Sequence, residues 1–148
     1  MINLPTWEQL PTLDLYLDQV LLYVNQQTSS AISLKEKPLT AAMINNYVKH
    51  GYLPKPIKKK YGQRQLARLL VVTICKPVFP IASIHEVIEL LGQELDSQAL
   101  YDSFVASLAG KDTDAHPLIA KACQTILAYQ ETLALAEQYQ GGSHEPKL

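Results

Sequence analysis

The sequence predicts an all-α fold with at most a minimal β wing. In most segments apolar residues recur every three or four positions, as they do along one face of a helix. Capping residues or prolines stand at the starts of these segments, and glycines or prolines stand at their ends. The 148 residues, 47% of them hydrophobic, are sufficient for one globular core of ordinary size.

The first predicted helix covers residues 13–27. Thr12 is its expected N-cap, and Asp14 and Asp18 lie on its outer face. Residues 28–39 show no period and are predicted to form a loop. The inward face of the helix carries Leu13, Leu17, Val20, Leu21 and Val24.

A short helix at 41–50 and a connector at 52–62 follow this loop. Thr40 caps the helix, and Gly51 ends it at a position where a left-handed residue is commonly needed. Two prolines keep the connector out of helix and leave room for one tiny hairpin at most.

Four further helices are predicted between the connector and the C-terminus. Their ranges are 63–75, 84–92, 96–110 and 117–139, and the tail 141–148 is predicted to be disordered. The expected boundary residues are Pro77 as a stop, Ser83 as a cap, Asp96 or Ser97 as a start, Gly110 as an end and Pro117 in a first turn.

Positive charge is concentrated in one central segment of the chain. Residues 35–76 hold ten of the thirteen Lys and Arg residues against a single acid, Glu36, although the whole chain has a net charge of −1. A local basic field of this kind favours a polyanionic partner, either nucleic acid or an anionic surface. The alternative is a charged surface that only contacts water.

The helix at 41–50 has a face suited to a DNA major groove. Because a helix turns by about 100° per residue, Ile44, Tyr47 and Val48 share its inward face. The opposite face is small, polar and cationic: Ala permits close approach, Asn pairs with adenine, and Lys neutralises phosphate or reads guanine. That face carries Ala42, Asn45, Asn46 and Lys49.

The order of these segments resembles the MerR-type winged helix-turn-helix. The resemblance runs from about residue 39 to 90 and rests on the capped helix, the Gly51-Tyr52-Leu53-Pro54 step and Tyr61 where the family's wing ends. It also includes the step at 80–84. It implies a winged helix-turn-helix DNA-binding domain at 1–92, followed by a C-terminal helical part at 93–140 that serves dimerisation or effector binding.

Three departures from the MerR pattern concern the base contacts. Asn45-Asn46 replaces the Arg-Tyr pair of the recognition helix, the wing is shorter, and the loop before the recognition helix is about twelve residues long. The whole chain, with its LPTWEQLPTLDLYLDQV opening, also resembles a family of uncharacterised Gram-positive bacterial proteins, named only as a domain of unknown function and thought to be MerR-like.

The resemblance implies a sequence-specific transcriptional regulator that binds double-stranded DNA. The connector at about 54–61 would act as its wing and hold cations against phosphates. Tyr61 either donates its hydroxyl to a phosphate or packs under the wing. The expected DNA-binding residues are Thr40, Ala42, Asn45, Asn46, Lys49, Lys55, Lys58, Lys59, Lys60, Tyr61, Arg64 and Arg68.

The last helix is the expected site of a homodimer. It is about 34 Å long at 1.5 Å per residue, and its apolar stripe is wide enough to be shared between the subunit and a partner. Helices five and six could also enclose an effector pocket, although nothing in the sequence identifies an effector. The stripe contains Ile119, Ala122, Cys123, Ile126, Leu133 and Ala136.

Other classes of function find little support in the sequence. His85-Glu86-Val87-Ile88-Glu89 resembles half of a zinc-protease helix but lacks the second His, and its acids are expected on a solvated face. No P-loop, nucleophile elbow or dinucleotide fingerprint is present. We therefore expect no catalysis, no metal and no cofactor.

The chain is expected to be cytoplasmic. A secretory signal is not expected, and no apolar run is long enough to span a membrane. The two cysteines lack CxxC spacing and are predicted to be buried, reduced thiols. Two alternative functions remain: a protein-interaction module that kept the winged shape, and an architectural, excisionase-like DNA binder without ligand sensing.

Overall fold

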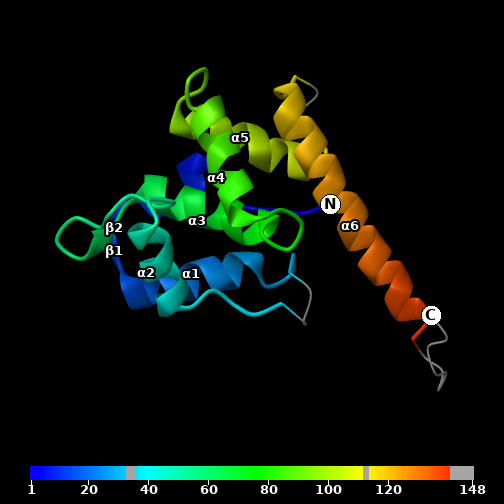
Figure 1. Ribbon diagram of the computed structural model, residues 1–148, viewed down its shortest axis with the longest axis horizontal. Helices are drawn as coiled ribbons and strands as arrows, with labels where there is room; N and C mark the ends of the chain where they lie inside the picture. The colour runs from blue at the N-terminus through cyan, green and yellow to red at the C-terminus, as the bar shows by residue number, and fades with distance from the viewer. Residues whose placement is uncertain (33–35, 112–113, 141–148) are drawn as a thin grey trace.

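The protein is mostly helical, in agreement with the predicted fold class. The computed structural model describes residues 1–32, 36–111 and 114–140, so the predicted disordered tail lies outside the described residues. Figure 1 shows the elements packed into one body, with the last helix running past its edge. In chain order they are η1 (Trp7–Gln9), β1 (Leu15–Tyr16), α1 (Leu17–Thr28), α2 (Ala41–Lys49), β2 (Lys60–Tyr61), α3 (Gln63–Cys75), α4 (Ile81–Leu91), α5 (Ser97–Leu108) and α6 (Pro117–Gln138).

α3 is the central element of the core. Nine of its thirteen residues are buried, and it packs against α1, α4, α5 and β2. This burial matches the sequence, because α3 has apolar residues on nearly every side after its first turn. The predicted inward residues Leu66, Leu69, Leu70, Thr73 and Ile74 are all buried.

The N-terminal segment packs against α5. The Ile2 amide donates to the Leu108 carbonyl at 3.1 Å. The Trp7 amide donates to Asp102 Oδ1 at 2.8 Å, and the Tyr101 hydroxyl donates to the Pro5 carbonyl at 2.7 Å. Buried residues from Ile2 to Ile126 form one hydrophobic cluster. The core therefore continues across the domain boundary that the sequence predicted at residue 92.

The start of the first helix was predicted wrongly. Leu13 is 78% exposed and lies outside the helix, which begins at Leu17. Tyr16 is the N-cap residue in place of Thr12, and its amide donates to Gln19 Oε1 at 2.9 Å. The physical reason is tertiary, because Leu15 and Tyr16 pair with β2 and are held in extended conformation.

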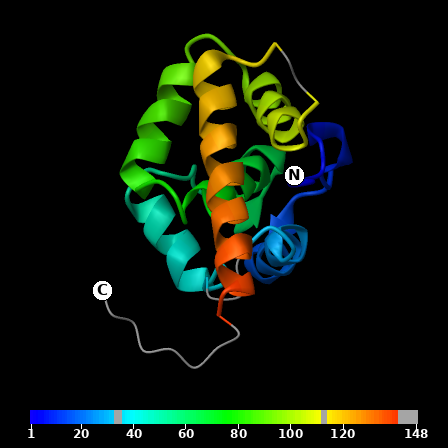
Figure 2. The same ribbon diagram turned by 90° about the vertical axis from the view of Figure 1, so that its right-hand side faces the viewer.

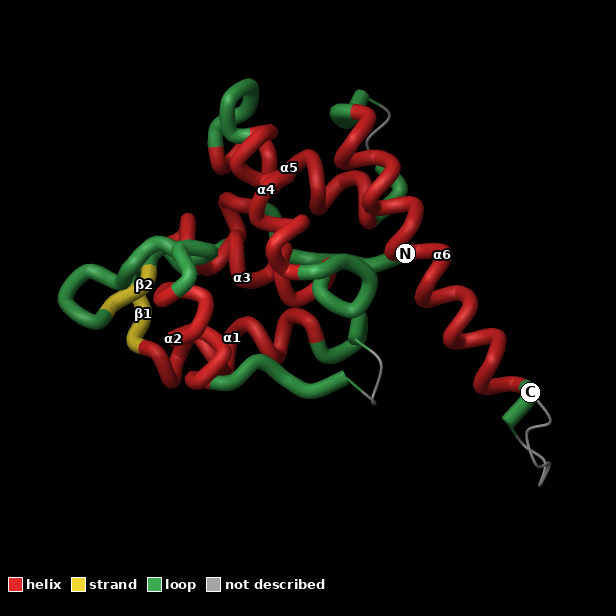
Figure 3. Tube along the Cα trace, viewed as in Figure 1, coloured by secondary structure: helices red, strands yellow, loops and turns green. Residues whose placement is uncertain are grey.

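The only sheet among the described residues is a two-stranded antiparallel pair (Figure 3). Leu15 pairs with Tyr61, and Tyr16 pairs with Lys60. The connector contributes one strand and a single bridge between Ile57 and Lys60. The predicted tiny hairpin is thus present. Its second strand, β2, also pairs with β1, which precedes α1 in the chain.

The fourth helix also begins earlier than predicted. Pro80, whose φ of −60° and ψ of 143° are extended, is its N-cap residue, and Ser83 lies inside the first turn. The fixed φ of proline suits a helix start and needs no side-chain cap. By contrast, Asp96 caps α5 by accepting from the Ala99 amide at 2.7 Å, and Pro117 occupies the first turn of α6, as predicted.

The C-terminal end of α6 extends beyond the body of the protein. Ile119, Cys123 and Ile126 are buried, whereas residues 134–140 are exposed. Ala136, predicted on the inward stripe, is therefore exposed. Figure 2 shows α6 crossing the front of the molecule and continuing below it.

The two cysteines are buried free thiols, as predicted. Burial raises the pKa of both Cys75 and Cys123 to about 12, and their proximity to each other adds to the increase for Cys75. Both thiols are therefore protonated near neutral pH and act as small apolar side chains.

Candidate nucleic-acid interface

α2 separates an apolar face from a polar one, as its sequence predicted. Ile44 and Tyr47 are buried beneath it, and burial raises the pKa of the Tyr47 hydroxyl. The opposite face is exposed to solvent and contains no acid. It carries Ala42, Asn45, Asn46 and Lys49.

Both ends of α2 are held by local hydrogen bonds. The Thr40 hydroxyl accepts from the Met43 amide at 3.2 Å, so Thr40 acts as the helix cap. At the other end Gly51 has a φ of +75°, in the left-handed region that favours glycine. The Tyr52 amide then donates back to the Tyr47 carbonyl at 2.8 Å.

Asn25 holds the long loop before α2 against α1. Its amide nitrogen donates to the Leu39 carbonyl at 3.0 Å, and its carbonyl oxygen accepts from the Leu39 amide at 2.9 Å. These paired bonds fix Leu39, the residue that directly precedes the Thr40 cap. The start of α2 is therefore fixed despite the length of the loop. The sequence signal was an Asn inside a helix, where its propensity is poor.

The connector ends in a tight two-residue hairpin. The Ile57 amide donates to the Lys60 carbonyl and the Lys60 amide to the Ile57 carbonyl, each at 3.0 Å. Lys58 and Lys59 form the loop with φ values of +51° and +67°. Positive φ at both central positions is the type I′ arrangement, for which Asn-Gly is the favoured pair. Two lysines at this turn carry a conformational cost of the kind that accumulates at functional sites.

The base of the hairpin is anchored to the core. Tyr61 is only 4% exposed, and burial raises the pKa of its hydroxyl. Of its two expected roles, packing under the wing fits this burial and phosphate contact does not. Lys60 Nζ lies 5.1 Å from the centre of the Tyr16 ring on β1, a cation–π distance.

Gln65 joins the two ends of the connector. Its side-chain oxygen accepts from the Gly62 amide at 3.0 Å, and its side-chain nitrogen donates to the Lys55 carbonyl at 3.3 Å. Neighbouring Gln63 donates to the Leu10 carbonyl at 3.4 Å. The first turn of α3 thus holds the connector, a role that the sequence analysis did not assign to either glutamine.

Arg64 and Arg68 have different environments, although the sequence placed them on one strip. Arg64 is exposed. The Arg68 side chain is 11% exposed, and its terminal nitrogen donates to Glu89 Oε1 at 2.7 Å and to His85 Nδ1 at 2.9 Å. The hydrogen bond from Arg68 lowers the pKa of Glu89. Arg68 is therefore already paired. Its partner Glu89 is 59% exposed, so it lies on a solvated face as expected and also binds Arg68.

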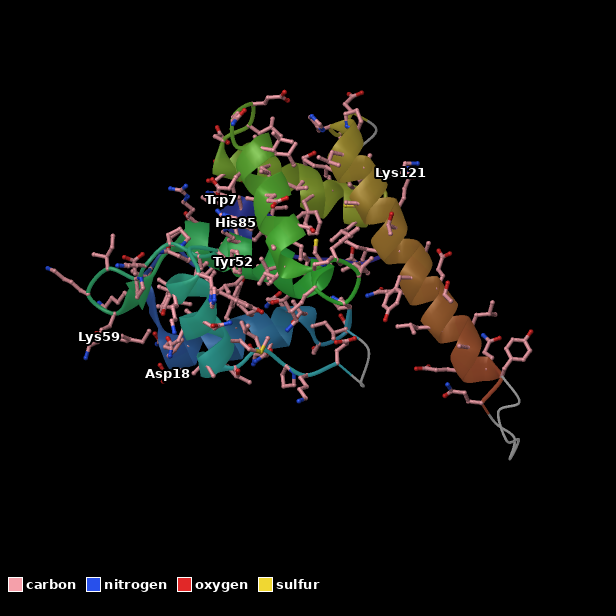
Figure 4. The ribbon with its side chains drawn as sticks, in the orientation of Figure 1. Trp7, Asp18, Tyr52, Lys59, His85 and Lys121 are labelled. Atoms are coloured by element: carbon pink, nitrogen blue, oxygen red, sulfur yellow. The ribbon has the colours of Figure 1, made fainter. Side chains whose placement is uncertain are left out.

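Three aromatic rings connect the end of α2 to α4. The His50 ring stacks on Tyr52 at 5.8 Å between ring centres, and Tyr52 meets His85 at 5.1 Å. His50 Nδ1 also lies 2.9 Å from the Asn46 carbonyl. Figure 4 shows Tyr52 and His85 side by side at the centre of the molecule. Through these contacts α4 supports the turn that follows α2.

The basic hairpin and α2 lie at the end of the molecule opposite α6 (Figure 1). Lys59 projects from this end, and Asp18 from the first turn of α1 lies at the same end (Figure 4). The hairpin and α2 thus lie at one end of the molecule, and that end also carries an acid. Of the twelve expected residues only Tyr61 is buried; the exposed or half-buried ones are Thr40, Ala42, Asn45, Asn46, Lys49, Lys55, Lys58, Lys59, Lys60, Arg64 and Arg68.

The described residues contain no cluster of three or more His, Cys, Asp or Glu side chains that could hold a metal ion. Within the same residues, no helix has both the length and the apolar character needed to cross a membrane.

Comparison with known families gives one match. Residues 5–104 match DUF1836, a domain of unknown function. The chain belongs to the DUF1836 family. The matched region includes α2, the hairpin and the whole of α3 to α4, and it ends before α6. Neither the curated proteins nor the solved structures contain a significant match.

The turn geometry predicts that replacing Lys58-Lys59 by Asn-Gly stabilises the protein. Each non-glycine residue in the left-handed region costs on the order of 1–3 kcal/mol. We expect the double variant K58N/K59G to raise the free energy of unfolding by about 1–3 kcal/mol, measured by urea denaturation. K58A/K59A is the matched control, because it loses the same two charges but keeps both Cβ atoms. Equal stabilities of the two variants would contradict the strained turn.

Proposed function

We propose that the protein is a DNA-binding transcriptional regulator with a MerR-like winged helix-turn-helix. α1 and α2 form the helix-turn-helix, α2 enters the major groove, and the hairpin at 57–60 is the wing. The observation that carries the proposal is the pair Lys58-Lys59 at a turn whose backbone favours Asn-Gly. The two lysines remain at this turn despite its conformational cost, and the exposed face of α2 carries no acid. Together these features indicate a polyanionic partner.

The order of the elements supports this assignment. A short strand precedes α1 and pairs with the strand that ends the hairpin, so the hairpin is held next to the start of α1. α3 and α4 then pack behind them. The proposal keeps the DNA-binding domain at the N-terminal side and puts its action in the cytoplasm.

Each exposed residue has a role that follows from its chemistry. Ala42 permits close approach to the groove, while Asn45 and Asn46 can form paired hydrogen bonds to adenine. Lys49 contacts a phosphate or guanine. Phosphate contacts come from the wing and from the start of α3. These cations are Lys55, Lys58, Lys59, Lys60 and Arg64.

Three residues of the expected set act indirectly in this proposal. Thr40 caps α2, Tyr61 packs under the wing, and Arg68 holds α4 through Glu89. They position the interface and leave the contacts to DNA to their neighbours.

The salt dependence of DNA binding tests the wing. Replacing Lys58, Lys59 and Lys60 together by Ala should weaken binding and reduce the slope of log K against log salt by about 2 to 3, because each phosphate contact contributes about 0.9 to that slope. Fluorescence anisotropy with labelled duplex DNA over a salt series measures this change.

Two further variants control for net charge and for folding. The triple variant of Lys111, Lys121 and Lys147 loses the same charge from the C-terminal part and should leave the slope unchanged. K58N/K59G should bind DNA more weakly although its fold is more stable. An unchanged slope in the wing variant would remove the wing from the interface.

The projecting part of α6 is proposed to pair in a homodimer. Leu135, on the end of α6 that leaves the body, and Tyr139, which follows the helix, are exposed. A twofold dimer would read two half-sites spaced by about 10 base pairs or a multiple of it. Sequencing the DNA fragments selected by the purified protein should therefore return an inverted repeat. Fragments without any shared motif would contradict sequence-specific regulation.

A second candidate function is architectural DNA binding, and one observation favours it. Ile57, next to the two turn lysines, is 75% exposed. Proteins that bend DNA insert apolar side chains between base pairs in the minor groove, with cations beside them. In this function the hairpin would act as a wedge and the α2 face would contribute less.

DNA bending distinguishes the two candidates. If Ile57 is a wedge, wild-type protein should bend bound DNA by at least about 20°, and Ile57→Ala should lose most of this bend while keeping the salt slope. The end-to-end distance of doubly labelled DNA reports the bend. Leu90→Ala, which removes another exposed apolar side chain from α4, is the matched control. Equal bending by wild type and Ile57→Ala would contradict the wedge.

A further inference from the structure

An apolar groove lies between α4 and the N-terminal half of α6. Its volume is about 140 Å³, and its floor is formed by α3 and α5. Figures 1 and 2 show α4 and α6 as neighbours on the side of the molecule away from the hairpin. The residues that define it are Val71 and Cys75 on α3, Val87 and Ile88 on α4, Phe104 on α5 and Ala122 on α6.

The groove exists because the apolar face of α4 is incompletely covered. Ile84 and Leu91 are buried, but Val87 and Ile88 between them are only half-buried. Leu118 on the facing side of α6 is 37% exposed at the rim. Protein interiors are normally close-packed, with few voids larger than a water molecule. A gap of this size between four helices is therefore a feature that requires an explanation.

The lining selects against charged and strongly polar ligands. Its polar side chains are the Ser83 hydroxyl at the rim and the Cys75 thiol, and burial keeps that thiol protonated. No lining residue carries a charge. An ion entering the groove would lose its hydration without gaining a partner, which is strongly unfavourable.

The volume sets the size of the occupant. An apolar cavity of roughly 150 Å³ lined by aliphatic and aromatic side chains stays dry and binds benzene. We propose that the groove between α4 and α6 is a binding site for a small uncharged apolar molecule, of the size of a single aromatic ring or a short hydrocarbon chain. Such a molecule would complete the packing between α4 and α6.

This site is separate from the proposed DNA interface, but one of its walls, α4, also supports that interface. Ile84 and Val87 face the groove, whereas His85 and Glu89 on another side of α4 contact Tyr52 and Arg68. Ligand binding can be measured without DNA, so its result does not depend on the proposed function.

Titration of the full chain with toluene tests the proposal. We expect a saturable rise in the midpoint of thermal unfolding, since a ligand that binds only the folded state stabilises it, and saturable shifts in the NMR signals of the methyl groups that line the groove. Benzoate and benzylamine have the same ring with a negative or positive charge. Neither should produce these effects at matched concentration.

Two substitutions locate the binding site. Ala122→Leu fills the groove from α6 and should weaken toluene binding at least tenfold. Ala128→Leu is the matched control, because it adds the same atoms to an exposed position on the same helix, and it should bind like wild type. Ser83→Leu obstructs the exposed rim from α4 and serves if Ala122→Leu does not fold.

Three results would overturn the inference. One is the absence of a saturable toluene effect on wild-type protein. The second is equal toluene affinity in wild type and in the filled variants, which would place binding elsewhere. The third is equal binding of toluene and the charged analogues, which would show that the apolar lining does not select the ligand.

Discussion

Burial of α3 is the constraint on which the rest of the structure depends. α3 contacts α1, β2, α4 and α5, and nine of its thirteen residues are buried. Its first turn also reaches outward, because Gln65 bonds to both ends of the connector and Gln63 to the segment before β1. The most buried helix of the protein is therefore also the one that holds the basic hairpin in place.

The candidate interface combines a rigid support with a locally unfavourable turn. Tyr61 and the pairing of β1 with β2 fix the base of the hairpin. At the tip, Lys58 and Lys59 adopt a conformation that favours other residues. A strained turn persists only when the surrounding structure determines it, and the anchored base meets that condition. The two lysines make the turn less stable, but they place two positive charges at the farthest point of the hairpin.

α4 has two roles that its sequence does not separate. One side supports the end of α2 through His85 and holds Arg68 through Glu89. Another side forms a wall of the apolar groove opposite α6. The family match ends at residue 104, so α3, α4 and α5 contribute to the groove from within the matched region and α6 contributes from outside it. A molecule bound in the groove would contact the same helix that supports α2.

The sequence by itself determined that the helices are present, although not where α1 and α4 begin. It also determined the caps at Thr40 and Asp96, the left-handed Gly51 and the exposed face of α2. These features depend on neighbours within one or two turns, where periodicity and capping chemistry are sufficient. Tertiary structure decided the features that depend on contacts between residues far apart in the sequence. Leu15 and Tyr16 pair with β2 and therefore do not belong to the first helix. Tyr61 is buried and packs under the hairpin, and Arg68 forms an ion pair with Glu89. The I′ turn at Lys58-Lys59 and the groove beside α4 also belong to this group, because a lysine pair carries no turn signal and a void between helices has no pattern in the chain. Each depends on residues far apart in sequence, which only the folded core brings together.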